Sequence, residues 1–219
     1  MTQTSATELA ALLCSRLCHD MLSPVGALSN GLELLADETD PAMRKQCIEL
    51  MEQSATSSTN KLKFFRLAFG AAGGFGDAVP VEESQDVINA LAEGAKGVEV
   101  NWAIEGSSLP KPAVKVMLNF AQIAMDALVR GGSLDIGAEM REGAAEIVVR
   151  ASGERIAFDD AIGEAIEGNS SEEGLTSRTA AAHMIALLAE ETGGGLQYKR
   201  SDDALVLGAV LPQPAGMIG

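Results

Sequence analysis

The sequence has few basic residues, few aromatic residues and no long apolar run. Its 16 Lys and Arg residues stand against 31 Asp and Glu residues, for a formal net charge of −15. Nucleic-acid binding depends on Lys and Arg that neutralise phosphates, and an anionic membrane surface repels an acidic chain. We therefore expect neither partner. The apolar runs are far shorter than the ~20 residues of a membrane span, and residues 1–6 lack a signal-peptide pattern, so we expect a cytoplasmic protein that meets other proteins.

Cysteine and histidine are also scarce. The three cysteines, Cys14, Cys18 and Cys47, are odd in number and lack a secretory context, which predicts reduced thiols. On a helix His19 is rotated by ~100° from Cys18, so burial at a helix interface is favoured over a metal site for the cysteines. The second histidine, His183, lies in an apolar segment and is expected at the edge of a core.

The first third of the chain predicts a helical hairpin. A helical period of apolar residues runs from about residue 7 to residue 35, and a second helix is expected from Pro41 to about Phe69, with Asp40 as its N-cap. The short connection makes the two helices antiparallel. The first stripe consists of Leu13, Leu17, Met21, Pro24, Leu28, Leu32 and Leu35, and the second of Met43, Cys47, Leu50, Ser54, Ser58, Leu62 and Phe65.

Two helices cannot enclose apolar stripes of this length. A second copy of the chain would bury them, which predicts a dimeric four-helix bundle; the alternative is that the C-terminal half covers the hairpin. Four glycines within residues 70–76 indicate a joint. We therefore divide the chain into a hairpin domain at 1–70, a linker at 71–77 and a second domain at 78–219.

The second domain has mixed helical and strand patterns. Together they predict an α+β sandwich with an antiparallel or mixed sheet of about five strands and helices on one face. The expected helices are residues 82–96, 110–130, 159–167 and 176–192, and the expected strands are residues 98–104, 133–140, 144–151, 196–200 and 204–211.

The stretch from Arg16 to Pro24 contains the candidate chemistry. On the first helix His19 points about 180–200° away from the apolar stripe and therefore faces outward. Ser15 and Gly26 share its face, so this face is small and open. Pro24 removes a backbone hydrogen bond and predicts a kink, at a cost of about 3 kcal/mol. Taken alone, these features favour an ordinary surface histidine.

The residues around His19 also resemble a known motif. His19-Asp20-Met21-Leu22-Ser23-Pro24 is similar to the H-[DE]-x-x-[ST/N]-P phosphoacceptor motif of sensor histidine kinases. The order of hairpin, glycine joint and sandwich resembles the core of that family over nearly the whole chain. The resemblance implies a degenerate version of the kinase ATP-binding domain at the C-terminus, because its nucleotide-binding boxes are altered.

The asparagine box of the kinases aligns with residues 118–132. Ile123 stands at the position of the metal-binding asparagine and cannot ligate Mg²⁺. Asn119 matches an earlier asparagine of the box, and Asp126 falls where the family has a lysine or a similar polar residue. The first of the three boxes is therefore degraded.

The other two boxes are degraded as well. In the D-x-G-x-G box, Ala151 replaces the aspartate that reads adenine and Arg155 replaces the second glycine. In the G-x-G box, Thr179 and Ala181 replace the glycines that let backbone approach phosphates. An intact histidine motif beside three degraded boxes implies that the phosphoryl group comes from another protein.

Residues 17–35 are further similar to the ChpT family of histidine phosphotransferases, which act in alphaproteobacterial phosphorelays. The resemblance implies a homodimer that passes phosphoryl groups between receiver domains of a hybrid histidine kinase and of response regulators. It implies that His19 carries the group and that Asp20 either orients His19 or accepts its ring proton. No cofactor is expected in this chain, and Mg²⁺ is expected on the receiver. Residues expected to dock the receiver or to stabilise the phosphoryl group are Ser15, Arg16, Leu22, Ser23, Pro24 and Gly26.

Two other functions remain open at this point. One is an active sensor histidine kinase with diverged boxes, which would label itself from ATP without a partner. The other is a non-catalytic interaction scaffold, whose function would survive the substitution His19→Ala.

Overall fold

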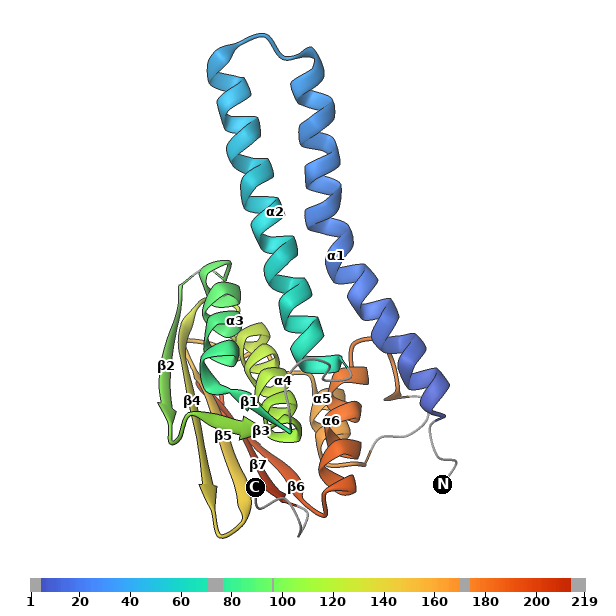
Figure 1. The fold of residues 1–219 in the computed structure, drawn as a ribbon, viewed down its shortest axis with the longest axis vertical. Coiled ribbons are helices and arrows are strands. Elements are labelled where there is room, and N and C mark those ends of the chain that lie inside the picture. Colours follow the sequence, from blue (N-terminus) through green and yellow to red (C-terminus); the bar gives the residue numbers. More distant parts are fainter. Residues whose placement is uncertain (1–4, 71–76, 96, 170–173, 214–219) are drawn as a thin grey trace.

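A computed structural model of the chain describes residues 5–70, 77–95, 97–169 and 174–213. Figure 1 shows a long helical hairpin standing on an α/β sandwich. The linker expected at 71–77 lies outside the described residues except for Asp77. The helices are α1 (Ala6–Asp37), α2 (Pro41–Phe69), α3 (Val81–Glu93), α4 (Lys111–Ala127), α5 (Asp160–Ile166) and α6 (Ala180–Glu191). The strands are β1 (Ala78–Pro80), β2 (Val98–Ile104), β3 (Ser108–Pro110), β4 (Gly132–Arg141), β5 (Ala144–Ser152), β6 (Gly195–Arg200) and β7 (Ala204–Pro212).

The hairpin of α1 and α2 forms as the sequence predicts, and local signals set its ends. The side chain of Asp40 accepts a hydrogen bond from the amide of Ala42 at 3.0 Å, which caps α2. Arg44 Nη1 donates to the carbonyl oxygens of Leu35 at 2.9 Å and Glu38 at 2.7 Å, so the end of α1 is tied to the start of α2. The helix α1 continues through Pro24, which is buried.

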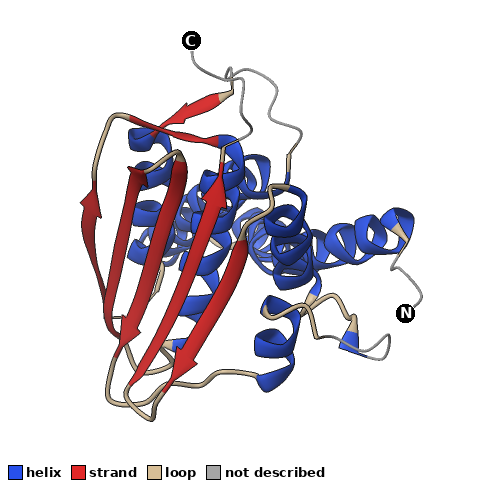
Figure 2. Cartoon of the chain, turned by 90° about the horizontal axis from the view of Figure 1, so that it is seen from below, coloured by secondary structure: helices blue, strands red, loops and turns tan. Residues whose placement is uncertain are grey.

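The main sheet has five strands in the order β2-β4-β5-β7-β6. Strand β2 runs parallel to β4, and the other neighbours are antiparallel, so the sheet is mixed. Helices cover one face of this sheet and leave the other face open (Figure 2). The predicted α+β sandwich with a five-stranded sheet is therefore confirmed.

Some elements differ from the prediction. The short antiparallel pair β1 and β3 was not predicted, because three-residue strands are too short to show a period. The helix α6 begins at Ala180, not at residue 176, because residues 176–179 form a turn in which Thr179 bonds to Thr176 through side chain and backbone. The helix α4 ends at Ala127, three residues before the predicted end.

The hairpin rests on the core of the sandwich through the end of α2. Phe64 and Phe65 are 4% and 6% exposed and belong to the same buried cluster as Phe120 of α4. Burial of each such side chain contributes about 1.5–3 kcal/mol to folding. In Figure 1 the end of α2 sits over α3 and α4, while the N-terminal part of α1 diverges from α2 and passes beside α6.

The sandwich covers only this lower part of the hairpin. Leu32, expected in the buried stripe, is 64% exposed, and Cys14 and Cys18 are exposed although burial was expected. A single chain therefore buries the predicted stripe only in part, and burial of Leu32 and of the two cysteines against a second chain stays a prediction. The exposed large apolar residues of the hairpin are Leu22, Val25, Leu32, Leu34, Met43, Ile48, Leu50 and Leu62. Among the described residues, no helix combines the length and the apolar character that crossing a membrane requires.

Candidate functional site

His19 lies on the open face of α1, as the helical rotation predicts. Its side chain is 88% exposed, and its Nδ1 atom lies 3.5 Å from Asp20 Oδ1. This distance is that of an electrostatic contact, longer than the roughly 2.7–3.2 Å of a formed N–H···O hydrogen bond. A ring proton on Nδ1 would face the Asp20 carboxylate in this arrangement and leave Nε2 as the free nitrogen.

Two further side chains, those of Arg16 and Lys61, contact Asp20. Its side chain is 35% exposed, and Oδ2 lies 3.8 Å from Arg16 Nε, one helical turn earlier. The carbonyl oxygen of Asp20 accepts a hydrogen bond from Lys61 Nζ of α2 at 3.0 Å. The residue beside the histidine is therefore anchored to both helices of the hairpin.

Arg16 faces the sandwich domain, away from the open face. Its side chain is only 18% exposed, and Nη2 lies 3.9 Å from Asp126 Oδ2 at the end of α4. Nη1 donates a hydrogen bond to the carbonyl oxygen of Arg178 at 3.3 Å. The guanidinium thus joins α1, α4 and the segment before α6.

Asp126 and Arg178 complete this junction, and neither was predicted as a site residue. The side chain of Asp126 is 61% exposed, so its desolvation by the surrounding junction is partial. This desolvation raises the pKa of the carboxyl above its usual value of 3.8, and Asp20 raises that pKa further, while Arg16, the hydrogen bond from Gln122 and Arg178 oppose the increase. Arg178 Nε lies 3.3 Å from Asp159 Oδ2, so the junction continues into the sandwich. The one sequence signal was an isolated acid in the apolar segment of α4.

The other predicted docking residues divide into two groups. Ser15 and Ser23 are exposed, Leu22 is 70% exposed, and a Cβ atom at Gly26 would meet no heavy atom within 4 Å. These four residues leave the surroundings of His19 open. Pro24 is buried, so it acts on this face only through the course of the helix.

Most positions of the altered nucleotide boxes are buried. Asn119 is 2% exposed and donates a hydrogen bond from Nδ2 to the carbonyl oxygen of Lys115, in its own helix, at 2.8 Å. Thr179 is 2% exposed, and its hydroxyl donates to the carbonyl oxygen of Gly174 at 2.6 Å. Of the other box positions, Ile123, Ala151 and Ala181 are 6%, 0% and 3% exposed, whereas Arg155 is exposed.

The structure also places the second histidine of the chain. His183 is half-buried on α6, and burial lowers its pKa below the usual 6.5, so it is a boundary residue as expected. Among the described residues, no group of three His, Cys, Asp or Glu side chains is placed to hold a metal ion.

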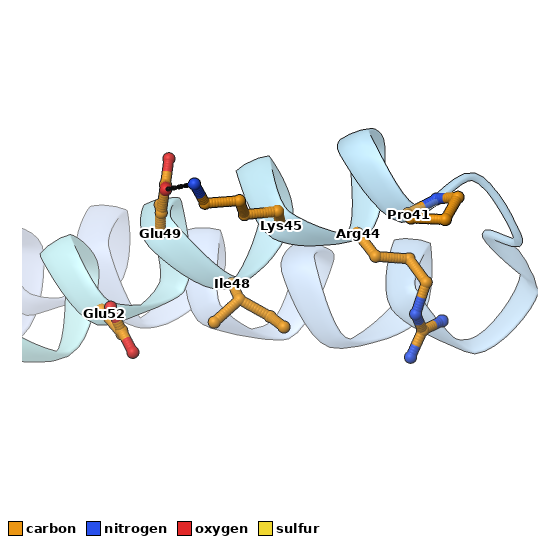
Figure 3. Close-up of a pocket in the computed structure, with 6 residues that line it drawn as sticks. All are labelled: Pro41, Arg44, Lys45, Ile48, Glu49 and Glu52. Carbon is orange, nitrogen blue, oxygen red and sulfur yellow. Dashed lines mark ion pairs between the residues drawn. The ribbon is translucent and has the colours of Figure 1, made fainter.

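A surface hollow of about 610 Å³ lies near the tip of the hairpin, and Figure 3 shows that α2 supplies its whole lining. It is about 20 Å along the hairpin from His19, at 1.5 Å per residue. A hollow lined by one helix is an open groove and not an enclosed ligand site. Its lining residues are Pro41, Arg44, Lys45, Ile48, Glu49 and Glu52.

Comparison with known proteins gives consistent matches. Residues 81–204 match the model of the histidine phosphotransferase C-terminal domain. Protein phosphotransferase ChpT of Brucella abortus (strain 2308) is 34% identical over 205 residues, which cover 94% of this chain and 96% of that protein. A bacterial phosphotransferase solved at 1.7 Å superposes with a TM-score of 0.83 and 32% identity, over 95% of this chain and 98% of that chain.

The sequence similarity, the domain match and the fold agree along nearly the whole chain. The resemblance of residues 17–35 to the ChpT family is confirmed by the similarity over 94% of the chain. The chain therefore belongs to the histidine phosphotransferase family of bacterial phosphorelays that includes ChpT.

Proposed function

We propose that His19 is the residue that carries the phosphoryl group, shuttling it between the receiver domain of a hybrid histidine kinase and the receiver domains of response regulators. The observation that supports this most directly is the 88% exposed imidazole with the Asp20 carboxylate at its Nδ1. An exposed ring on an open helix face can enter the active site of another protein, where an aspartyl phosphate is held.

For transfer of the phosphoryl group, this chain mainly has to supply a correctly oriented nucleophile, the imidazole ring of His19. The neutral ring attacks the phosphorus of the aspartyl phosphate through Nε2, in line with the leaving carboxylate oxygen. The new N–P bond forms as the P–O bond breaks, and the aspartate leaves as a carboxylate. The ring, which keeps its Nδ1 proton, becomes cationic, and Asp20 stabilises that charge. The reverse reaction delivers the group to the next receiver.

The receiver supplies the acceptor or donor aspartate and the Mg²⁺ in this proposal. The open face formed by Ser15, Leu22, Ser23 and Gly26 would contact the receiver around His19. The acidic composition and receiver partners favour a cytoplasmic location. An autokinase is the disfavoured alternative, because the altered box residues Ile123, Ala151, Thr179 and Ala181 are buried, and the hydroxyl of Thr179 is bonded to the carbonyl oxygen of Gly174.

We also propose that the chain functions as a homodimer with a four-helix bundle. Val25 and Leu32 are 50% and 64% exposed and lie seven residues apart, on one side of α1; Ile48 and Leu62 are 43% and 50% exposed and lie two heptads apart on α2. The groove in Figure 3, which contains Ile48, lacks a second wall that a partner helix would supply. Paired hairpins would bury these residues.

The transfer proposal is tested with a receiver domain carrying a labelled phosphoryl group. Wild-type protein should accept the label in an acid-labile form, and His19→Ala should accept none. The matched control is His183→Gln, which changes the chain's other histidine and should keep full transfer. Label that remains on the His19→Ala variant would contradict the proposal. Label taken from ATP without any partner would instead support an active kinase.

A further inference from the structure

The hairpin and the sandwich are joined by a charged contact one helical turn from His19. Three acceptors surround the Arg16 guanidinium: the carboxylates of Asp20 and Asp126 and the carbonyl oxygen of Arg178, at 3.8, 3.9 and 3.3 Å. They come from α1, α4 and the segment before α6. The contact therefore relates the phosphoacceptor turn directly to the second domain.

Arginine suits this contact, and its orientation excludes a more obvious role. A planar guanidinium has five N–H donors in a fixed fork and can serve several acceptors at once, which a lysine ammonium does with less fixed geometry. The side chain of Arg16 is 18% exposed, against 88% for His19. Arg16 is turned into the junction, so it is not placed to receive a phosphoryl group on the open face.

We propose that Arg16 is a positioning residue for phosphoryl transfer: it holds the Asp20 carboxylate beside His19 and fastens that helical turn to Asp126 and to the Arg178 carbonyl. The inference rests on the proposed role of His19. In this arrangement the degenerate domain is a fixed support for the histidine, and Asp126 is the anchor on that support.

Positioning predicts a specific kinetic effect. Transfer requires Nε2 in line with the phosphorus, and a misplacement of about 1 Å can lower a rate by up to ~10²-fold. Loss of Arg16 leaves the exposed docking face intact, because Arg16 is not part of it. The transfer step should therefore slow while the affinity for the receiver stays nearly the same.

The test measures single-turnover transfer from a phosphorylated receiver over a range of receiver concentrations. We expect Arg16→Gln to lower the maximal rate about tenfold, within the range known for misplaced groups, with a half-saturating concentration close to that of wild type. Arg16→Lys should be intermediate, and Asp126→Asn should also lower the maximal rate. The control is Arg130→Gln, which removes an ion pair within the sandwich (Nη1 to Glu154 Oε1, 3.1 Å) and should change neither quantity.

A double-mutant cycle tests whether Arg16 acts through Asp20. Asp20→Asn alone should slow transfer, and adding Arg16→Gln should then have little further effect, since groups that act as a unit are not additive. Independent, additive effects would overturn the proposal, as would a wild-type maximal rate in Arg16→Gln. So would a change confined to the half-saturating concentration, because that would make Arg16 a docking residue.

The outcomes also separate this inference from the proposed function. If His19→Ala still accepted the label, the role of His19 would fail whatever Arg16 did. If His19→Ala were inactive and Arg16→Gln were fully active, only the positioning role would fail. Circular dichroism and thermal unfolding of each variant verify folding. If Arg16→Gln does not fold, Asp126→Asn and Arg16→Lys serve as the test, and wild-type maximal rates in both would overturn the proposal.

Discussion

At the scale of residues, His19 has the exposure of a surface side chain and one nearby partner group. Asp20 lies at its Nδ1 atom, and the next charged group, Arg16, points into the domain junction. A catalytic histidine in an enclosed site has its partners within its own chain. An exposed one must receive them from a second protein, which agrees with a carrier that serves more than one receiver.

The sequence predicted part of this site and missed part of it. The motif identified His19 and Asp20, and their outward placement followed from helical rotation alone. The contacts of Arg16 with Asp126 and Arg178 join residues that are more than 100 positions apart. Periodicity describes only neighbours on one element, so contacts of this kind need the folded chain.

The stability of the protein should depend on pH through the partly desolvated carboxyl group of Asp126. Its pKa is raised in the folded protein, so the native state binds more protons than the unfolded state, and stability falls as pH rises through that pKa. Asparagine imitates the protonated form. We therefore expect Asp126→Asn to unfold at a higher temperature than wild type at pH 7, with the difference closing below the usual pKa of 3.8. Thermal unfolding followed by circular dichroism at several pH values measures it.

This prediction has a direct control. Asp159 also contacts a junction arginine, Arg178, at 3.3 Å. An Asp159→Asn variant loses the ion pair with Arg178, while the asparagine oxygen can still cap α5, so it should gain no stability at pH 7. An equal gain in melting temperature for Asp126→Asn and Asp159→Asn would contradict the assignment of the pH dependence to Asp126. If the prediction holds, Asp126→Asn transfers the phosphoryl group more slowly although it is more stable than wild type. A slower transfer could not then be attributed to poorer folding.

At the scale of elements, the sequence predicted the bounds of helices and strands best where capping residues or turn residues set them. The cap of Asp40 and the proline after it gave the start of α2, and strand β2 was predicted from residue 98 to residue 104, as observed. The predicted start of α6 was wrong, because the hydroxyl of Thr179 donates a hydrogen bond to the carbonyl oxygen of Gly174 and so closes a turn before the helix. Such side-chain bonds compete with the helix and do not show in the apolar pattern.

The cap at the hairpin tip offers a test at this scale. Asp40→Ala removes the hydrogen bond to the amide of Ala42 and should lower the free energy of unfolding by about 1 kcal/mol. For a domain of this size that loss corresponds to about 2–4 °C in melting temperature. Thermal unfolding measures the change, and Asp40→Ser, which keeps an acceptor, should lose much less. Equal losses in both variants would show that the cap does not stabilise α2.

At the scale of the whole molecule, the sequence allowed two partners for the apolar faces of the hairpin, namely the C-terminal domain and a second copy of the chain. Within a single chain the C-terminal domain covers only part of these faces. The sandwich packs against the end of α2 and the N-terminal part of α1. The upper hairpin stays uncovered, with Leu32 and Leu50 64% and 63% exposed. Periodicity showed that both helices are amphipathic. It could not tell which apolar residues face the other helix and which face a second chain.

The homodimer predicts that a charge on this uncovered face will separate two chains. Leu32→Glu would place a carboxylate within the apolar interface of the bundle, where an unpaired charge is strongly unfavourable. We expect the dimer dissociation constant to rise by on the order of a hundredfold or more, since one buried unpaired charge costs several kcal/mol. Sedimentation equilibrium at micromolar concentrations measures the change. The control is Val148→Glu, at a 51% exposed position on β5 away from the hairpin, which should leave the dimer intact. A wild-type chain that stays monomeric would contradict the four-helix bundle, because the exposed heptad positions would then need another partner.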